Sequence, residues 1–228
     1  LTSAHDTTAN AMAWVWFELA QRPEILRQVV AEVDRVLDGR DPTYEDVKNL
    51  KYTWAVFEET LRLYPPVWTM SREAQTEDHI PLDDGRKLRV KKGDTIMLSP
   101  YVVHRRASYW PDPLAFDPDR FMEEQEPDRQ KLSYFPFGGG ARLCLGFRFA
   151  QIEAVVLIAM MVQKYNMMLV PGQNIKPEPM ITLRPNGPVW FKLSPRISSK
   201  LQTAPSVSAP RSVQPARQPE PMVCPVRQ

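Results

Sequence analysis

The chain has 228 residues, of which 43% are apolar and 25% are charged, a mixture that allows one or two domains with a buried core. Its net charge is +2, and residues 194–228 carry more basic than acidic side chains while the rest of the chain is slightly acidic. This balance excludes the basic face expected of a nucleic-acid binder, and the longest apolar run, residues 154–162, is far too short to span a membrane.

The first part of the chain is expected to be helical, because apolar side chains recur there with helical spacing. Pro23 suits the first position of a helix, and Gly39 suits the position after its end. The segment beginning at Thr43 has the form of a capping box, which opens a short helix. The expected helices cover residues 2–20, 23–37, 44–49 and 54–64.

The middle and the end of the chain alternate short strands with turns. Prolines crowd residues 104–134 and allow only turns and brief helices there, whereas a long apolar helix is expected over residues 147–162. Residues 194–228 contain seven prolines and no aromatic side chain, which is typical of a disordered tail. Strands are expected at residues 69–74, 87–90, 94–98, 167–170, 180–183 and 189–193, with a hairpin turn at 83–85.

The most informative segment is a glycine-rich loop, residues 137–146, which places Cys144 directly before the long apolar helix. A thiolate ligates metal at neutral pH when positive charge and backbone N–H groups lower its pKa, and the start of a helix offers both. Glycines let the backbone approach a flat cofactor closely, and Arg142 can pair with a carboxylate. The alternative is a buried structural cysteine that packs as a small apolar side chain.

Four segments, in order, resemble the C-terminal half of a cytochrome P-450. The loop has the family pattern F-x-x-G-x-R-x-C-x-G, and Glu59 and Arg62 form its E-x-x-R pattern. The other two are residues 3–8, similar to the family's central-helix pattern with Ala4 where a glycine is usual, and residues 110–121, similar to its meander. The resemblance implies a mainly α fold with small β-sheets (α+β), in which residues 1–193 are a partial cytochrome P-450 domain.

The resemblance also implies a heme b cofactor with Cys144 as its proximal iron ligand. In that case Asp6 and Thr7 lie over the distal face, where they bind dioxygen and relay protons. Glu59, Arg62 and Arg120 form a buried structural triad, although Glu58 competes for Arg62 by spacing alone. The other residues expected to contact the heme are Phe137, Gly140, Arg142 and Gly146 in the loop, and Arg72 and His104 near the propionates; for His104, a packing role is equally open.

The function implied is that of a heme-thiolate monooxygenase, which inserts one oxygen atom from dioxygen into an apolar organic substrate such as a fatty acid or a sterol. A ferredoxin or a flavin reductase would supply electrons, attracted by Arg105, Arg106, Arg142 and Arg148. Two alternatives stay open: a truncated fragment without catalysis, and an enzyme that rearranges a peroxide without a reductase. The chain is expected to continue a longer protein, because Leu1 starts inside a helix, so membrane contact and localisation are undetermined.

Overall fold

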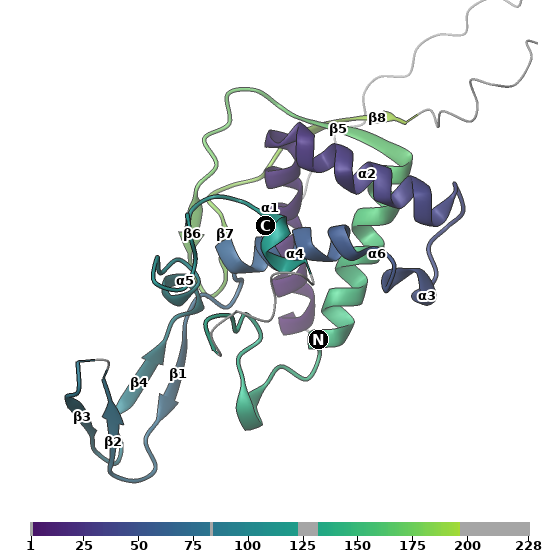
Figure 1. Ribbon diagram of the computed structural model, residues 1–228. Coiled ribbons are helices and arrows are strands. Elements are labelled where there is room, and N and C mark those ends of the chain that lie inside the picture. The colour runs from purple at the N-terminus through teal and green to yellow at the C-terminus, as the bar shows by residue number, and fades with distance from the viewer. Residues whose placement is uncertain (1, 83, 123–131, 197–228) are drawn as a thin grey trace, which may run out of the picture. The chain divides into compact units, whose positions relative to one another are not determined.

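The computed structural model of the protein describes residues 2–82, 84–122 and 132–196 (Figure 1). Most of the expected tail, with Cys224, and part of the expected turn at 83–85 lie outside these residues. The described part is mainly α-helical with small β-sheets, which confirms the expected fold class. None of its helices is long and apolar enough to cross a membrane.

The core lies between four helices, and their apolar faces meet (Figure 1). On α2, Ile25, Val29, Val33 and Leu37 follow one another at intervals of four residues, and each is buried. Fully burying a side chain of this size stabilises the folded state by about 1.5–3 kcal/mol. The core helices are α1 (Thr2–Gln21), α2 (Pro23–Leu37), α4 (Lys51–Leu63) and α6 (Phe147–Lys164).

Helix α2 begins and ends as its sequence predicts, since Pro23 is its first residue and the chain turns left-handed directly after it. Asp38 has φ 51° and Gly39 has φ +87°, so the second position favours glycine. The capping box at Thr43 is also confirmed, but the helix that it opens, α3 (Tyr44–Val47), is only one turn long.

Helix α4 begins three residues earlier than expected, at Lys51. The buried carboxylate of Glu32 on α2 accepts hydrogen bonds from the backbone N–H groups of Tyr52 and Thr53, both at 2.8 Å. The first N–H groups of a helix have no partner within the helix, so this carboxylate takes the place of a local cap. The expectation of a start at residue 54 was wrong because the capping group is distant in sequence.

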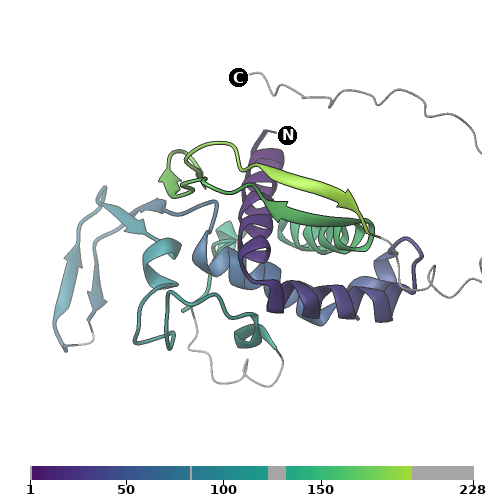
Figure 2. The same ribbon diagram turned by 90° about the horizontal axis from the view of Figure 1, so that it is seen from above.

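The strands of the described residues form four antiparallel pairs. The two pairs in the middle of the chain extend away from the helices, as both views show (Figures 1 and 2). The pairs are β1 (Met70–Glu73) with β4 (Thr95–Leu98), β2 (Asp78–Pro81) with β3 (Lys87–Val90), β5 (Tyr165–Leu169) with β8 (Phe191–Pro195), and β6 (Pro177–Pro179) with β7 (Leu183–Pro185).

Three strand expectations need correction. The strand expected at residues 180–183 was wrong, because Met180, Ile181 and Thr182 form the turn between β6 and β7. Strand β2 was not expected, since its polar sequence lacks the alternation of a half-buried strand. Finally, the strand expected at residues 189–193 is shifted, because β8 begins at Phe191 and runs on to Pro195.

The described part of the proline-rich segment, residues 104–122 and 132–134, contains one brief helical turn, as expected, and a short helix directly precedes it. Residues 100–121 include α5 (Pro100–Val103) and the 3₁₀ turn η1 (Pro118–Phe121). Proline is the first residue of both elements, where its missing N–H group costs no hydrogen bond. A second 3₁₀ turn, η2 (Gly140–Arg142), lies within the glycine-rich loop.

Candidate functional site

The cysteine loop is closed by its own backbone. The N–H group of Cys144 donates to the carbonyl oxygen of Phe137 at 3.0 Å, and that of Leu143 donates to Gly140 at 3.1 Å. Gly138 has φ +75° and Gly140 has φ +65°, a conformation that side chains rarely adopt. This backbone conformation therefore favours glycine at both positions. The side chain of Cys144, at the end of the turn, is exposed.

The start of α6 lies directly after Cys144, as the sequence predicts. Gly146 is the N-cap and Phe147 the first helical residue. The N–H group of Phe147 donates to the carbonyl oxygen of Cys144 at 3.4 Å, so the thiol-bearing residue is tied to the helix end. The positive end of the helix dipole favours negative charge at this place.

The residues around Cys144 suit a flat apolar cofactor that brings its own metal ligands. Residues 139–146 are exposed throughout, and Leu143, Leu145 and Phe149 present large apolar side chains to the surface. Within the described part of the chain, no group of three or more His, Cys, Asp or Glu side chains could hold a bare metal ion. A single thiolate on a glycine loop fits a metal whose other ligands come from an organic ring.

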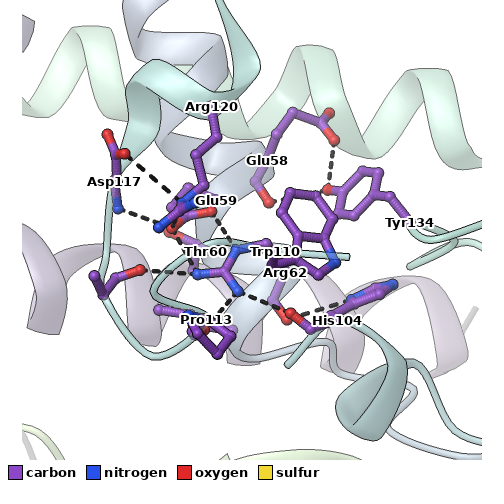
Figure 3. A network of polar contacts seen from close by, with 12 residues as sticks. Glu58, Glu59, Thr60, Arg62, His104, Trp110, Pro113, Asp117, Arg120 and Tyr134 are labelled. Carbon is purple, nitrogen blue, oxygen red and sulfur yellow. Dashed lines mark hydrogen bonds and ion pairs between the residues drawn. The ribbon is translucent and has the colours of Figure 1, made fainter. Parts of the chain in front are cut away.

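Glu59, Arg62 and Arg120 come together as the sequence predicts (Figure 3). Arg62 forms a bidentate pair with Glu59, in which Nε donates to Oε2 at 2.6 Å and Nη2 donates to Oε1 at 2.8 Å. Arg120 approaches Glu59 less closely, at 3.7 Å. Burial raises the pKa of Glu59, while the two arginines oppose that rise.

Arg62 also joins α4 to the segment that follows α5. Its guanidinium donates to the carbonyl oxygens of His104 at 2.8 Å, Pro113 at 2.7 Å and Ala115 at 2.8 Å (Figure 3). With the two bonds to Glu59, these account for all five N–H groups of the side chain, which is fully buried. Its role is therefore to hold the fold together.

For His104, the geometry favours packing over a propionate contact. The ring is fully buried, its Nε2 accepts from the N–H group of Phe135 at 2.9 Å, and its Nδ1 lies 3.3 Å from the carbonyl oxygen of Arg62. Both ring nitrogens thus have backbone partners, which leaves none for a carboxylate. Burial, together with the charges of Arg62 and Arg105, lowers the pKa of His104 to about 3, so the ring is neutral.

Glu58 turns away from Arg62, which resolves the choice that helix spacing left open. Its carboxylate accepts hydrogen bonds at 2.6 Å from the hydroxyl of Tyr134 and at 2.6 Å from the side-chain amide of Gln151. Tyr134 precedes the cysteine loop and Gln151 follows it. Sequence reasoning missed both residues, since neither belongs to a motif and no local spacing links them to Glu58.

Asp6 lies at a polar junction between α1 and the turn that joins β6 to β7. Its Oδ2 accepts from the hydroxyl of Thr182 at 3.0 Å and from the side-chain amide of Asn10 at 3.3 Å. Asn10 also donates to the hydroxyl of Thr182 at 2.9 Å. Asp6 is exposed and Thr7, the next residue, is half-buried. Thr182 was missed because it is distant in sequence; Asn10, four residues after Asp6, could have been found from helix spacing.

The two arginines expected near propionates are both exposed. Arg72 lies on β1, where its guanidinium donates to the carbonyl oxygen of Ser71 at 2.8 Å, and Arg142 lies on η2. Asp6 forms hydrogen bonds with α1 and Thr182, whereas Cys144 forms hydrogen bonds with its own loop and with the start of α6. The structure therefore assembles the triad and the loop, and leaves the exposed residues open to a ligand.

Comparison with known proteins gives a consistent result. The chain is 39% identical over 196 residues to cyclooctatin synthase from Streptomyces melanosporofaciens, which covers 86% of this chain and 41% of that protein. It is 36% identical over 199 residues to the chloroplastic carotene epsilon-monooxygenase of Arabidopsis thaliana, covering 86% and 36%. The chain thus spans about two fifths of the length of these curated relatives.

Solved structures agree with the sequence relatives. The crystal structure of the cytochrome P-450 called CYP102L1 superimposes with a TM-score of 0.79 at 30% identity, covering 86% of this chain and 44% of that one. The cytochrome P-450DA heme domain gives a TM-score of 0.79 at 29% identity, covering 85% and 42%. The sequence profile described as cytochrome P-450 matches residues 1–192. The chain therefore belongs to the cytochrome P-450 family.

Proposed function

We propose that Cys144 is the thiolate ligand of a heme b iron and that the protein carrying this chain is a heme-thiolate monooxygenase. The observation that carries the proposal is the exposed Cys144, set in a glycine turn against the start of α6, without a ligand cluster for a bare metal in the described residues. The similarity to a solved heme domain supports it.

The heme would be held by one thiolate, two arginines and the loop backbone. Bound heme supplies the binding and reductive activation of dioxygen. Cys144 would ligate the iron and donate electron density to it, and Arg142 and Arg72, both exposed, would pair with the propionates. Phe137, Gly140 and Gly146 shape the loop so that the backbone lies close to the ring.

Asp6 and Thr7 supply protons on the distal side. Asp6 is exposed, so its carboxylate is in contact with solvent, and its orientation is fixed by bonds from Asn10 and Thr182. The hydroxyl of Thr7 is the next group along the helix and passes the proton inward. Asn10 and Thr182 act through Asp6 and are positioning residues.

An apolar, lipid-like substrate such as a fatty acid or a sterol fits the segments near Asp6. The indole N–H group of Trp68 donates to the carbonyl oxygen of Met180 at 2.9 Å, which ties the segment after α4 to the turn that bears Thr182. Ile181, at the tip of this turn, is 99% exposed and offers apolar surface. The name of the carotene monooxygenase supports an apolar substrate class.

Electrons come from a ferredoxin or a flavin reductase that docks beside the cysteine loop. Arg142 and Arg148 are exposed there and attract an acidic partner. Arg105 does not contribute, contrary to expectation, because its guanidinium is stacked on the ring of Tyr101 at 3.6 Å and donates to the carbonyl oxygen of Leu63. Burial lowers the pKa of Arg105.

The decisive experiment compares the two cysteines of the chain in the complete, heme-loaded protein. The wild-type protein and Cys224→Ala should both show the red-shifted ferrous–CO Soret band of thiolate ligation, and Cys144→Ala should lose it. Retention of that band in Cys144→Ala would show that another group ligates the iron. Product formation that requires NAD(P)H and a reductase separates the monooxygenase from a peroxide-rearranging enzyme.

A further inference from the structure

Glu58 and Glu59 are consecutive on α4, yet they serve different parts of the molecule (Figure 3). Glu59 pairs with Arg62 and fixes the segment between α5 and η1. Glu58 lies among buried groups with 6% of its surface exposed, and its two carboxylate oxygens accept bonds from Tyr134 and Gln151. Only the second glutamate of the pair belongs to the family's E-x-x-R pattern, so the first requires its own explanation.

The two donors to Glu58 lie on either side of the cysteine loop. Tyr134 stands three residues before Phe137, and its hydroxyl donates to Oε2 of Glu58 at 2.6 Å and lies 2.9 Å from the Glu58 carbonyl oxygen. Gln151 lies in the second turn of α6, and its amide donates to Oε1 at 2.6 Å. One carboxylate therefore fixes where the loop starts and where the helix after it lies.

The loop itself has little other support near Cys144. Its residues 139–146 are exposed, and its internal backbone bonds set its shape but not its place on the protein. That place depends on the anchored ends: the bond of the Phe135 N–H group to His104, the contact of the Phe137 and Phe147 rings, and the two bonds to Glu58. The Phe137–Phe147 contact joins the two ends to each other, whereas Glu58 joins both of them to α4.

We infer that Glu58, through Tyr134 and Gln151, is the positioning residue that sets the location of the Cys144 thiolate. The inference rests on the proposed role of Cys144 as the heme ligand. A short carboxylate bond to the hydroxyl of the half-buried Tyr134 and another to the amide of the buried Gln151 resist displacement of either flank, so the sulfur is kept at bonding distance from a metal. If the hydrogen bonds of Tyr134 and Gln151 to Glu58 are weakened, the bond between the Cys144 thiolate and the iron is expected to break more readily. The rest of the fold should change little.

The test uses Tyr134→Phe and Glu58→Gln in the complete, heme-loaded protein. Tyr134→Phe removes one hydroxyl, whereas Glu58→Gln leaves one acceptor oxygen for two donors and sets an NH₂ group against the other. The measurement is the rate at which the ferrous–CO complex loses its thiolate Soret band on mild heating, followed beside unfolding by far-UV circular dichroism. Both variants should lose the band about tenfold faster, as expected for one buried hydrogen bond lost.

A matched control is Tyr64→Phe. The hydroxyl of Tyr64 also donates to a buried carboxylate, Glu18, at 2.6 Å, but neither residue belongs to the loop. This variant should unfold more easily than the wild type. Its ratio of the rate of Soret-band loss to the rate of unfolding should equal that of the wild type. In the double variant, Glu58→Gln should add little to Tyr134→Phe, because the one acceptor oxygen that remains at position 58 can still accept from Gln151.

The outcomes separate the inference from the function on which it rests. If the wild-type band does not depend on Cys144, the proposed function fails. If the band depends on Cys144 but Tyr134→Phe and Glu58→Gln behave like Tyr64→Phe, the function stands and the positioning role of Glu58 is overturned. If Tyr134→Phe and Glu58→Gln both lose the Soret band faster without unfolding earlier, and Tyr64→Phe does not, the positioning role of Glu58 is supported.

Discussion

Two buried polar side chains, Arg62 and His104, show how this fold tolerates polar groups in its interior. Each has no exposed surface, and each has its N–H and lone-pair sites matched by named partners. Arg62 stays charged beside a carboxylate, whereas His104 receives only backbone partners and stays neutral. Because burial without a partner carries a large penalty, the two bonds of His104 contribute to the stability of the fold.

The pKa of His104 predicts a pH dependence of stability. The imidazole has an ordinary pKa of 6.5 when the chain is unfolded and about 3 when it is folded, so between these values only the unfolded chain binds the proton. The contribution of the neutral His104 to the free energy of unfolding is therefore complete above pH 6.5 and decreases as the pH falls toward 3. For one proton, the slope is about 1.4 kcal/mol per pH unit.

Urea unfolding of the complete protein at several pH values between these limits measures this contribution. In His104→Gln, where an amide can still donate and accept, the free energy of unfolding should fall less steeply with decreasing pH than in the wild type. The variant His79→Gln changes an exposed imidazole on β2 and should keep the wild-type slope. Equal slopes in all three proteins would mean that His104 binds its proton equally well in the folded state.

At the scale of helices and strands, the sequence predicts what depends on nearby residues. Helix α2 was predicted from its apolar spacing and from Pro23 at its start, and α6 from its long apolar run, all of which are local signals. The start of α4 was not, since its cap is Glu32, twenty residues earlier in the chain. The turn at Met180–Thr182 was mistaken for a strand because its apolar side chains are exposed at a hairpin tip, a position that composition does not reveal.

The long-range cap of α4 gives a prediction for Glu32→Gln. The carboxylate accepts three hydrogen bonds, from the N–H groups of Tyr52 and Thr53 and from the Thr53 hydroxyl, each at 2.8 Å. Glutamine has one acceptor oxygen and turns an NH₂ group toward the remaining donors, so the folded state should lose about 1–3 kcal/mol. Chemical denaturation measures the loss, and Glu24→Gln, at an exposed carboxylate of the same helix, should cost less. Equal effects of the two substitutions would contradict the capping role.

Across the whole chain, the candidate site joins residues that are far apart in sequence. The triad could be predicted from the family resemblance, which selects Glu59 over Glu58 and adds Arg120. The two groups added by the structure could not, because Glu58 with Gln151, and Asp6 with Thr182, are separated by 93 and 176 residues. Such pairs depend on how the helices and hairpins pack, and no local pattern encodes them.

The contact between Asp6 and Thr182 gives a prediction about proton supply in the complete, heme-loaded protein. The hydroxyl of Thr182 donates to Asp6 and accepts from Asn10, so Thr182→Val removes both bonds with little change in shape. If Asp6 delivers protons as proposed, Asp6→Asn should lower turnover about a hundredfold. Thr182→Val should lower the product formed per NAD(P)H by about fivefold, since the loss of one such bond is worth about 1 kcal/mol.

Two further measurements decide whether Thr182 acts through Asp6. The solvent deuterium isotope effect on turnover should rise in Thr182→Val, because proton delivery becomes slower, and Thr182→Ser should restore the wild-type value by returning the hydroxyl. In Asp6→Asn, adding Thr182→Val should change little, since the carboxylate that Thr182 orients is already gone. If Thr182→Val alone forms as much product per NAD(P)H as the wild type, Asp6 needs no support from the hairpin turn. If Asp6→Asn keeps the wild-type turnover, Asp6 does not take part in proton delivery.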